Sequence, residues 1–399
     1  MFAWLGRLIQ RLLRIIKFLV GTVVVLALAG AIFTWFTSNH FAAFGGSPDP
    51  EKLRASPHFA NGKFVNPEPT SLMQPSKWAS SLREFAFGDE MRTPTCPLPM
   101  VTDAPARLAT APASGLRVTW LGHSTTLIEL DGVTVLTDPM WSERPSPSTA
   151  FGPKRFHAPP IALDALPHLD AVLISHEHYD HLDERTVRAL ATRGVPFHVP
   201  LGIGAHLRAW GVPEAQIHEH DWWQDATLAH GVRVVSTPSR HFNGRGLPWR
   251  TGALWTSWSI VGPRHRAFFS GDTGLSDSLR EIRKREGPFD VALFEIGQWT
   301  RAWGDIHLGP AGALEAHARL GAKVLIPIHW STFVLAYHAW SEPAETLVTE
   351  AAKRGVTVLT PRLGEPVEPA ATPLPKTTAW WRALPPIAAK CPDAAPAKP

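Results

Sequence analysis

The sequence predicts an α/β protein in which two sheets are sandwiched between helices and one transmembrane helix precedes them. Three features of the 399-residue chain favour this architecture: runs of strand-like segments, strand–helix units that follow them, and a charge-free apolar run near the N-terminus. The chain is long enough for one large domain with extensions. Its formal net charge of +4 comes without a basic stripe, so nucleic acid is not an expected partner.

Residues 1–37 are expected to form a basic N-terminus and a transmembrane anchor. The run 18–36 carries no charge and, at about 1.5 Å per residue, is just long enough to cross a bilayer core as a helix. Four basic residues precede it, and no Lys or Arg follows until Lys52. This bias places the N-terminus in the cytoplasm and the rest of the chain on the opposite side, the periplasm in a bacterium. Secretion after signal cleavage is the alternative, because Ala27-Leu28-Ala29 resembles a cleavage site.

The remaining chain divides into three parts by composition. Residues 38–114 are rich in Pro, Ser and Asn, and we expect an extended arm that packs on the domain formed by residues 115–364. Residues 365–399 are rich in Pro and Ala, and we expect a mobile tail. The two cysteines, Cys96 and Cys391, form no Cys-x-x-Cys pair, which excludes a cysteine zinc site. They could pair with each other if the domain lies outside the cytoplasm.

The elements of residues 115–364 are predicted from periodicity and from turn residues. A hairpin is expected around Asp131-Gly132, and Asp183 is expected to cap a helix that ends near Gly194. The predicted strands are 116–120, 125–130, 133–137, 169–174, 233–236, 257–261, 266–270, 291–296, 324–328 and 356–360. The other predicted helices are 277–286, 310–320 and 342–354.

The most informative stretch is Ser175-His176-Glu177-His178-Tyr179-Asp180-His181, which directly follows the predicted buried strand 169–174. It delivers four metal-ligand side chains within six residues. Imidazole and carboxylate groups suit zinc, and two separated pairs of them suit two metal ions. His241, Asp272 and His329 also follow apolar strands. Strand ends on one sheet edge are where functional residues gather, so we expect all of these groups to meet.

The His-x-His-x-Asp-His motif resembles that of the metallo-β-lactamase superfamily. Four further segments resemble the branch of N-acyl-phosphatidylethanolamine-hydrolysing phospholipase D and its bacterial relatives: 151–156, 254–259, 268–274 and 287–290. The resemblance covers residues 56 to 363, roughly. It implies a four-layer αββα sandwich of the metallo-β-lactamase type.

The resemblance also implies a site for two zinc ions, although other divalent transition metals suit such ligands. It assigns His176, His178 and His241 to one ion, Asp180, His181 and His329 to the other, and Asp272 to both. A carboxylate can span two ions that are about 3.5–4 Å apart. Zinc lowers the pKa of a shared water, and the resulting bridging hydroxide would attack phosphorus.

His307 matches a histidine that the family uses in catalysis, and it precedes a helix that begins with Pro310. The resemblance therefore implies catalytic roles for His307, Asp180 and Asp272. The chain departs from the family pattern at Glu295, where relatives usually carry proline, at Gly309, and in the segment 243–250. These departures concern the substrate pocket and leave the metal ligands unchanged.

Three functions are compatible with these features. The first is a membrane-anchored phosphodiesterase of phospholipase D type, which acts on a phospholipid or another phosphodiester. The second is a lactonase or sugar-phosphate hydrolase of the ascorbate-lactonase-like branch, which shares the metal ligands. The third is an envelope protein that binds zinc only for stability. We favour the first, because a bilayer anchor places the site beside lipid and a structural zinc site needs only one closed ion.

Overall fold

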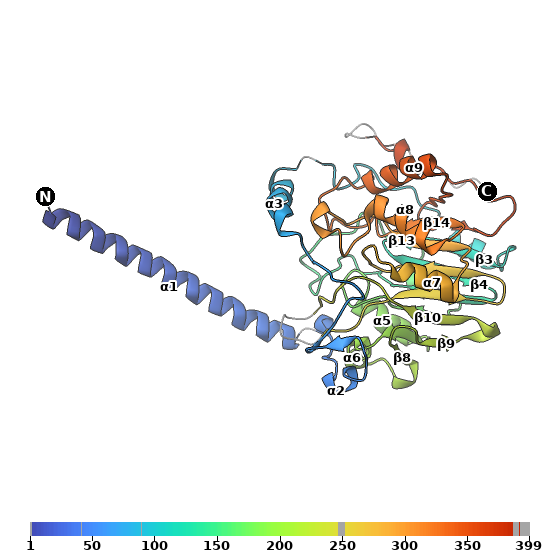
Figure 1. The fold of residues 1–399 in the computed structure, drawn as a ribbon, viewed down its shortest axis with the longest axis horizontal. Helices are drawn as coiled ribbons and strands as arrows, with labels where there is room; N and C mark the ends of the chain where they lie inside the picture. The colour runs from blue at the N-terminus through green and yellow to red at the C-terminus, as the bar shows by residue number, and fades with distance from the viewer. Residues whose placement is uncertain (1, 41, 89, 246–251, 386–390, 392–399) are drawn as a thin grey trace.

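The computed structural model describes residues 2–40, 42–88, 90–245, 252–385 and 391. Two mixed sheets pack face to face, helices cover their outer sides, and one long helix projects away from the domain (Figure 1). This arrangement confirms the predicted four-layer αββα sandwich.

The larger sheet has seven strands in the order β15-β3-β4-β5-β6-β7-β8. Strands β5 to β8 are parallel to one another, whereas β15, β3, β4 and β5 pair antiparallel. The strands are β3 (Leu116–Gly122), β4 (Thr125–Leu130), β5 (Val133–Thr137), β6 (Ala171–Leu173), β7 (Phe197–Pro200), β8 (Ile217–His220) and β15 (Pro366–Val367).

The smaller sheet has six strands in the order β14-β13-β12-β11-β10-β9. Strands β12, β13 and β14 are parallel. The strands are β9 (Asp225–Thr227), β10 (Arg233–Thr237), β11 (Ser257–Val261), β12 (Arg266–Phe269), β13 (Val291–Glu295) and β14 (Val324–Ile328). A separate hairpin pairs β1 (Phe59–Ala60) with β2 (Lys63–Phe64).

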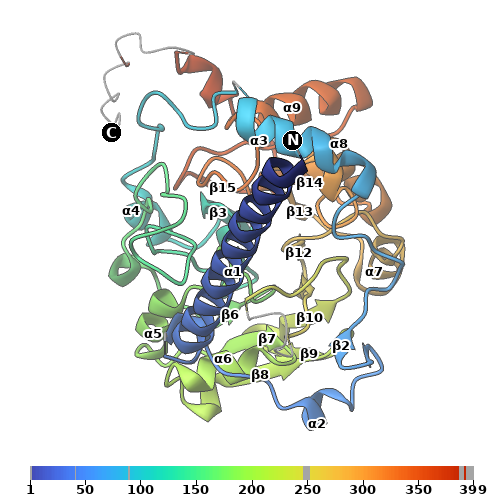
Figure 2. The ribbon, with the colours of Figure 1, turned by 90° about the vertical axis from the view of Figure 1, so that its left-hand side faces the viewer.

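Helices α5 and α6 pack on the seven-stranded sheet, and α7, α8 and α9 pack on the six-stranded sheet. The short helices α2, α3 and α4 lie in the N-terminal arm, after the long helix α1 (Figure 2). The bounds are α1 (Phe2–His40), α2 (Pro50–Leu53), α3 (Trp78–Phe87), α4 (Ala104–Leu108), α5 (Glu184–Ala191), α6 (Ile203–Ala209), α7 (Ser278–Glu286), α8 (Gly309–Leu320) and α9 (Glu342–Arg354).

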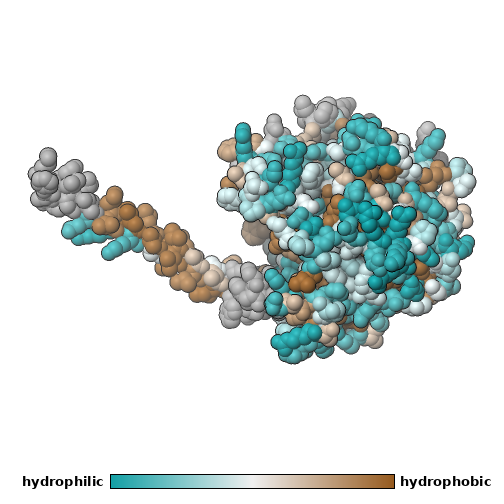
Figure 3. Space-filling model, viewed as in Figure 1, coloured by the Kyte–Doolittle hydropathy of each residue, from teal (hydrophilic) through white to brown (hydrophobic). Residues whose placement is uncertain are grey.

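Helix α1 contains a stretch, Gln10–Phe33, that is long and apolar enough to cross a membrane, with a mean hydropathy of 2.5 in its most apolar window of 18 residues. A signal sequence has the same composition and the same place in a chain. Between Phe18 and Phe33, helix α1 carries mainly apolar side chains, and they are exposed (Figure 3). In this stretch they pack on no other described part of the protein, as expected of a segment that another medium covers.

Three parts of the chain differ from the sequence-based expectations. The predicted strand 356–360 makes a single bridge, between Val358 and Leu325, because Pro361 lacks the N–H that would extend the ladder. Residues 365–385 are not a mobile tail, since β15 pairs with β3 and Trp380 is buried in the core. The strands β7, β8 and β9 were not predicted, because runs of three or four residues carry little periodicity.

The arm and the C-terminal segment are joined covalently. Cys96 and Cys391 form a disulfide across 295 residues of sequence. Both cysteines of the chain are therefore paired, in the manner of proteins from oxidising compartments.

The indole of Trp258 connects the two sheets directly below the metal-ligand motif. Its side chain is fully buried on β11, and its Nε1 donates a hydrogen bond to the backbone oxygen of Ile174, which follows β6 (2.9 Å). Ile174 immediately precedes Ser175 and the histidine motif. This contact therefore fixes the strand end from which the motif emerges.

We predict that Trp258→Phe lowers the free energy of unfolding by about 1–3 kcal/mol, because it leaves the buried Ile174 carbonyl without its donor. Urea unfolding followed by circular dichroism measures this effect. Trp380→Phe is the matched control, since Trp380 is also buried but its Nε1 has no hydrogen-bond partner. Equal losses in the two variants would show that the contact with Ile174 contributes nothing beyond packing.

Candidate metal centre

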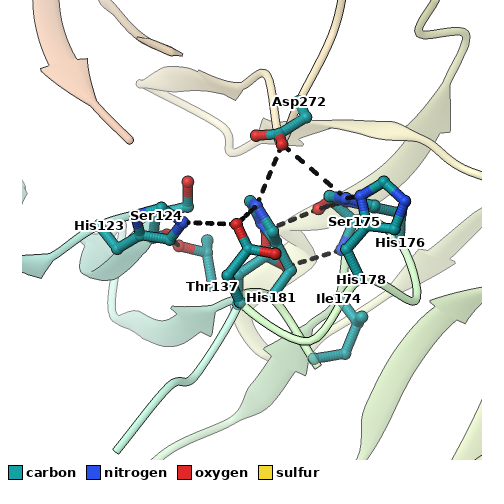
Figure 4. Close-up of polar contacts among 12 residues, drawn as sticks. His123, Ser124, Thr137, Ile174, Ser175, His176, His178, His181 and Asp272 are labelled. Atoms are coloured by element: carbon teal, nitrogen blue, oxygen red, sulfur yellow. Dashed lines mark hydrogen bonds and ion pairs between the residues drawn. The ribbon is translucent and has the colours of Figure 1, made fainter. Parts of the chain in front are cut away.

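All seven predicted ligands converge at one edge of the sandwich. Figure 4 shows four of them, His176, His178, His181 and Asp272. The motif residues occupy the loop between β6 and the N-terminus of α5, where the Asp183 side chain accepts a hydrogen bond from Arg185 N. The other three follow β10, β12 and β14, each at the end of its strand. The parallel strands of both sheets deliver their following loops to this edge, which explains the convergence. The residues brought together are His176, His178, Asp180, His181, His241, Asp272 and His329.

Among the described residues, potential ligand atoms form four overlapping groups, in each of which they lie within 4.8 Å of one another, and two of these groups together contain all seven predicted ligands. The first group is His176, His178, His241 and Asp272. The second is His123, Asp180, His181 and His329. Each of these two groups thus offers three imidazoles and one carboxylate, a donor set that suits a divalent transition metal.

Asp272 lies between the two groups. Its Oδ2 is 3.2 Å from the Nε2 atoms of both His181 and His329, in the second group. The same oxygen is 3.9 Å from the Nε2 atoms of His176 and His241, in the first group. Figure 4 shows Asp272 facing both His176 and His181. One carboxylate therefore faces the inward nitrogens of both groups.

Three of the inward-facing atoms make no hydrogen bond within the protein, although two of them lie close to the Asp272 carboxylate. His181 Nε2, His329 Nε2 and Asp272 Oδ1 are buried without a hydrogen bond. Unpaired buried polar atoms are costly, and buried groups of this kind are normally hydrogen-bonded or bound to metal. The cluster thus fits divalent metal ions, which would accept the imidazole lone pairs and offset the carboxylate charges.

The outward Nδ1 atoms of the same rings are held by the protein, which orients Nε2 toward the centre. The partners are Ser175 Oγ for His176 (2.9 Å), Asp138 Oδ2 for His181 (2.7 Å), Ile306 O for His241 (2.9 Å) and Gly297 O for His329 (3.1 Å). Asp138 also accepts hydrogen bonds from the backbone N and the hydroxyl of Ser175.

The protonation of the rings follows their surroundings. Burial and the neighbouring histidines hold the pKa of His176 and of His241 well below the ordinary range. Burial likewise lowers the pKa of His178 to about 4. Burial alone would lower the pKa of His329 too, but Asp272, Asp180 and Glu295 raise it to about 10. The imidazoles of the first group are therefore neutral and free to coordinate. The carboxylates around His181 and His329 raise the pKa of both rings and hold them protonated, and the same negative charge attracts a cation.

The comparisons with known proteins agree with this geometry. A family model described as "Beta-lactamase superfamily domain" matches residues 133–330. An uncharacterised protein of Mycobacterium tuberculosis is 46% identical over 351 residues, which cover 86% of this chain and 92% of the relative. The N-acyl-phosphatidylethanolamine-hydrolyzing phospholipase D 1 of Caenorhabditis elegans is 36% identical over 231 residues, 55% of this chain and 65% of the relative.

The chain belongs to the metallo-β-lactamase superfamily. It is a metal-dependent hydrolase of that superfamily. Among solved structures, a possible metal-dependent hydrolase from Veillonella parvula shares the fold, with a TM-score of 0.51 and 17% identity over 63% of this chain and 98% of the other.

His123 is a site residue that the sequence analysis missed. Its Nε2 lies 2.9 Å from Asp180 Oδ2, and its ring is 4.2 Å from that of His329. Burial, with the charge of His329 next in importance, lowers its pKa to about 3, so it too is neutral. Its position directly after β3 could have indicated it, because the other predicted ligands also follow strands.

His307 lies beside the metal-ligand groups and is held by Glu295. Its Nδ1 is 2.7 Å from Glu295 Oε2, and its ring stacks on that of His329 at 5.6 Å. Glu295, fully buried at the end of β13, also accepts hydrogen bonds from the backbone N atoms of Thr273 and Leu308. The replacement of the family's usual proline therefore supplies a carboxylate that orients His307. Burial by itself lowers the pKa of His307, but Glu295 and Asp272 raise it above its ordinary value.

The segment that leaves α1 packs against the metal-ligand loop. The ring of Phe44 contacts that of Tyr179 at 6.4 Å, edge to face. The buried guanidinium of Arg245 stacks on Tyr179 and donates hydrogen bonds to the backbone oxygens of Ala43, Glu177 and Leu182. Backbone on both sides of Tyr179 is thus tied to the end of α1 through one side chain.

The arm borders the other side of the centre. The Asn66 side chain pairs with the backbone N and O of His241. Ser71 N donates to Asp305, and Gln74 N donates to the backbone oxygen of Ala302, in the turn that precedes His307. Residues 66–74 therefore form part of the rim of the site.

We predict that Asp272→Ala removes bound metal and lowers the rate of hydrolysis by more than about 100-fold. Loss of a residue that only orients a metal ligand typically costs roughly 10- to 100-fold. The reason is that both groups of ligands face this one carboxylate. Metal content per chain and hydrolysis of an activated ester measure the two effects. Asp277→Ala, at an exposed position, is the control. Full activity with two metal ions per chain in Asp272→Ala would contradict the assignment.

Proposed function

We propose that this protein is a zinc-dependent phosphodiesterase that α1 anchors in a membrane. It releases the head group of a phospholipid by hydrolysing the phosphodiester. The similarity to the phospholipase D of Caenorhabditis elegans supports a phosphodiester substrate. The two ligand groups around Asp272 support a dinuclear site, which suits in-line displacement at phosphorus. Zinc is favoured by the ligand set of imidazoles and carboxylates.

In this proposal the seven residues predicted from the sequence hold two ions, one in each group, with Asp272 shared between them. His123 would complete the second group beside Asp180. Two bound divalent ions would supply the Lewis acidity that activates a water and offsets negative charge on the phosphoryl oxygens. The protein's part is to aim the imidazoles inward and to keep those of the first group neutral, which the Nδ1 contacts and the burial of the rings support.

His307 acts as the proton donor. Hydrolysis adds the oxygen of water to phosphorus and breaks the bond between phosphorus and the leaving oxygen, which needs a proton. Because Glu295 occupies the Nδ1 side of the ring, Nε2 remains for the leaving oxygen. The nearby carboxylates favour the protonated ring before the reaction.

The observation that carries the choice of a lipid over a soluble ester is the contact between the end of α1 and the metal-ligand loop. Phe44 and Ala43, directly after the apolar helix, touch Tyr179 and Arg245. A membrane-spanning α1 would therefore hold the site next to the bilayer surface. A soluble lactone or sugar phosphate would gain nothing from that placement.

The proposal is tested by assaying the purified full-length protein against bis-p-nitrophenyl phosphate, a panel of lactones, and N-acyl phospholipids in vesicles. We expect hydrolysis of the phosphodiester and of the phospholipids, with release of a phosphatidic acid. Turnover of lactones without turnover of either phosphodiester would favour the ascorbate-lactonase-like alternative. Two bound zinc ions with no hydrolysis of any substrate would favour a structural role.

We predict that His307→Ala lowers turnover of a phospholipid by about 10²–10⁴ with unchanged metal content, the usual range for a positioned acid–base group. A substrate with a good leaving group should lose less, because it needs no proton. His265→Ala is the matched control, since His265 also pairs with a carboxylate, Asp131, away from the site. Loss of metal, or equal slowing of both substrates, would exclude the proton-donor role.

We predict that the catalytic domain faces away from the cytoplasm. The basic residues before the apolar run and the disulfide between Cys96 and Cys391 both support this topology. Alkaline phosphatase fused to the C-terminus should be active, whereas β-galactosidase fused at the same place should not. The opposite pattern would show that the domain is cytoplasmic.

A further inference from the structure

Exposed apolar side chains outside α1 are concentrated in one short segment. Among the described residues after α1, seven large apolar side chains are exposed, and five of them lie between Leu72 and Phe87. The five are Leu72 (50%), Met73 (39%), Trp78 (58%), Leu82 (51%) and Phe87 (83%). A soluble protein rarely leaves such a group uncovered, so this segment marks a contact surface.

Helix α3 presents part of this surface as a stripe. Trp78 and Leu82 are four residues apart, so they lie one above the other on a single face of the helix. The intervening residues Ser80 and Ser81 and the following Arg83 are polar. An amphipathic helix with Trp and Leu on one face is the pattern of segments that lie in a membrane interface.

The surface lies on the side of the domain from which α1 departs. In Figure 1 the helix α3 is at the left edge of the domain, the same side toward which α1 projects. Figure 2, viewed from that side, shows both α1 and α3 in front of the sheets. If α1 crosses a bilayer, α3 therefore faces the same bilayer.

The segment is tied to the rim of the metal centre. Gln74, between Met73 and α3, donates its backbone N–H to Ala302 O (2.9 Å) in the 3₁₀ turn η6 (Arg301–Trp303). The ring of Trp303 lies 6.1 Å from that of His307. The end of α1 meets the centre on its other side, where Phe44 contacts Tyr179. The metal centre thus lies between the two elements that face the bilayer.

Phe151 is an exposed apolar side chain outside this segment. Its side chain is 76% exposed, and it follows the loop 142–149, which lines a cavity of about 110 Å³ together with Ala43. This loop is therefore next to the point where α1 enters the domain.

We propose that the apolar face of α3, with Leu72 and Met73, lies in the interfacial layer of the bilayer that α1 crosses, and that this second contact turns the mouth of the metal centre toward lipid head groups. The inference rests on the proposed membrane anchor. The occupant is a lipid surface because the stripe faces the direction of α1 and carries Trp78, a side chain enriched at membrane interfaces. One anchor point alone would let the domain rotate about α1, whereas two points fix its orientation.

The test uses the full-length protein in vesicles of phosphatidylcholine and phosphatidylglycerol. The native cysteines are paired, so an environment-sensitive fluorophore can be attached to one introduced thiol at a time. Leu82→Cys places the probe on the apolar stripe, Arg83→Cys is the neighbouring control on the polar side, and Val24→Cys reports insertion of α1. We expect blue-shifted emission, quenched by lipids with brominated tails, at Leu82 and at Val24 but not at Arg83.

The inference would be overturned if the probe at position 82 emitted as it does in water while brominated lipid quenched the probe at position 24. A blue shift at Leu82 without quenching by brominated lipid would also overturn it, since another protein surface would then cover α3. A water-like probe at Val24 would overturn the anchor and this inference together. Quenching at Leu82 in a protein that hydrolyses no phosphodiester would support the inference while contradicting the proposed reaction.

A second measurement links the contact to function. The double variant Trp78→Asp, Leu82→Asp should hydrolyse vesicle phospholipid about tenfold more slowly, because misplacement of a substrate by about an ångström already costs up to 10²-fold. Its thermal unfolding midpoint should be unchanged, since both side chains are exposed. Unchanged hydrolysis in a folded variant would contradict the orienting role.

Discussion

The buried carboxylate of Asp272 is the group on which the arrangement of the site depends. It follows β12 of the six-stranded sheet, yet it faces His176 and His181 from the loop after β6 of the seven-stranded sheet. The two sheets must therefore pack in one register for the ligand groups to form. The hydrogen bond from Trp258 Nε1 to Ile174 O holds the two sheets in that register. The partners of the Nδ1 atoms hold the imidazole rings in place.

The metal-ligand motif could be predicted because its chemistry is local. His176 to His181 lie within six residues after one buried strand, and strand ends together with the family resemblance indicated His241, Asp272 and His329. A strand-end position without a match to the family pattern was too weak a signal. His123 and Glu295 occupy the same edge, but their importance depends on which side chains the fold places opposite them.

Features that depend on distant contacts lay beyond sequence reasoning. The pairing of Cys96 with Cys391 spans 295 residues, and the burial of Trp380 in the core contradicts the Pro- and Ala-rich composition around it. The helix α3 falls in a segment whose composition indicated only an extended arm. The arm residues that border the centre, near Asn66 and Gln74, lead directly to that helix. A segment with little regular secondary structure therefore determines how the site is enclosed.

The central claim is that two metal ions lie on either side of Asp272. Crystals of the full-length protein or of its complex with detergent, measured with X-rays on both sides of the zinc absorption edge, test this claim most directly. The account predicts two anomalous peaks about 3.5–4 Å apart, one within each ligand group, with Asp272 between them. A single peak, or two peaks that leave Asp272 without contact to either ion, would contradict it.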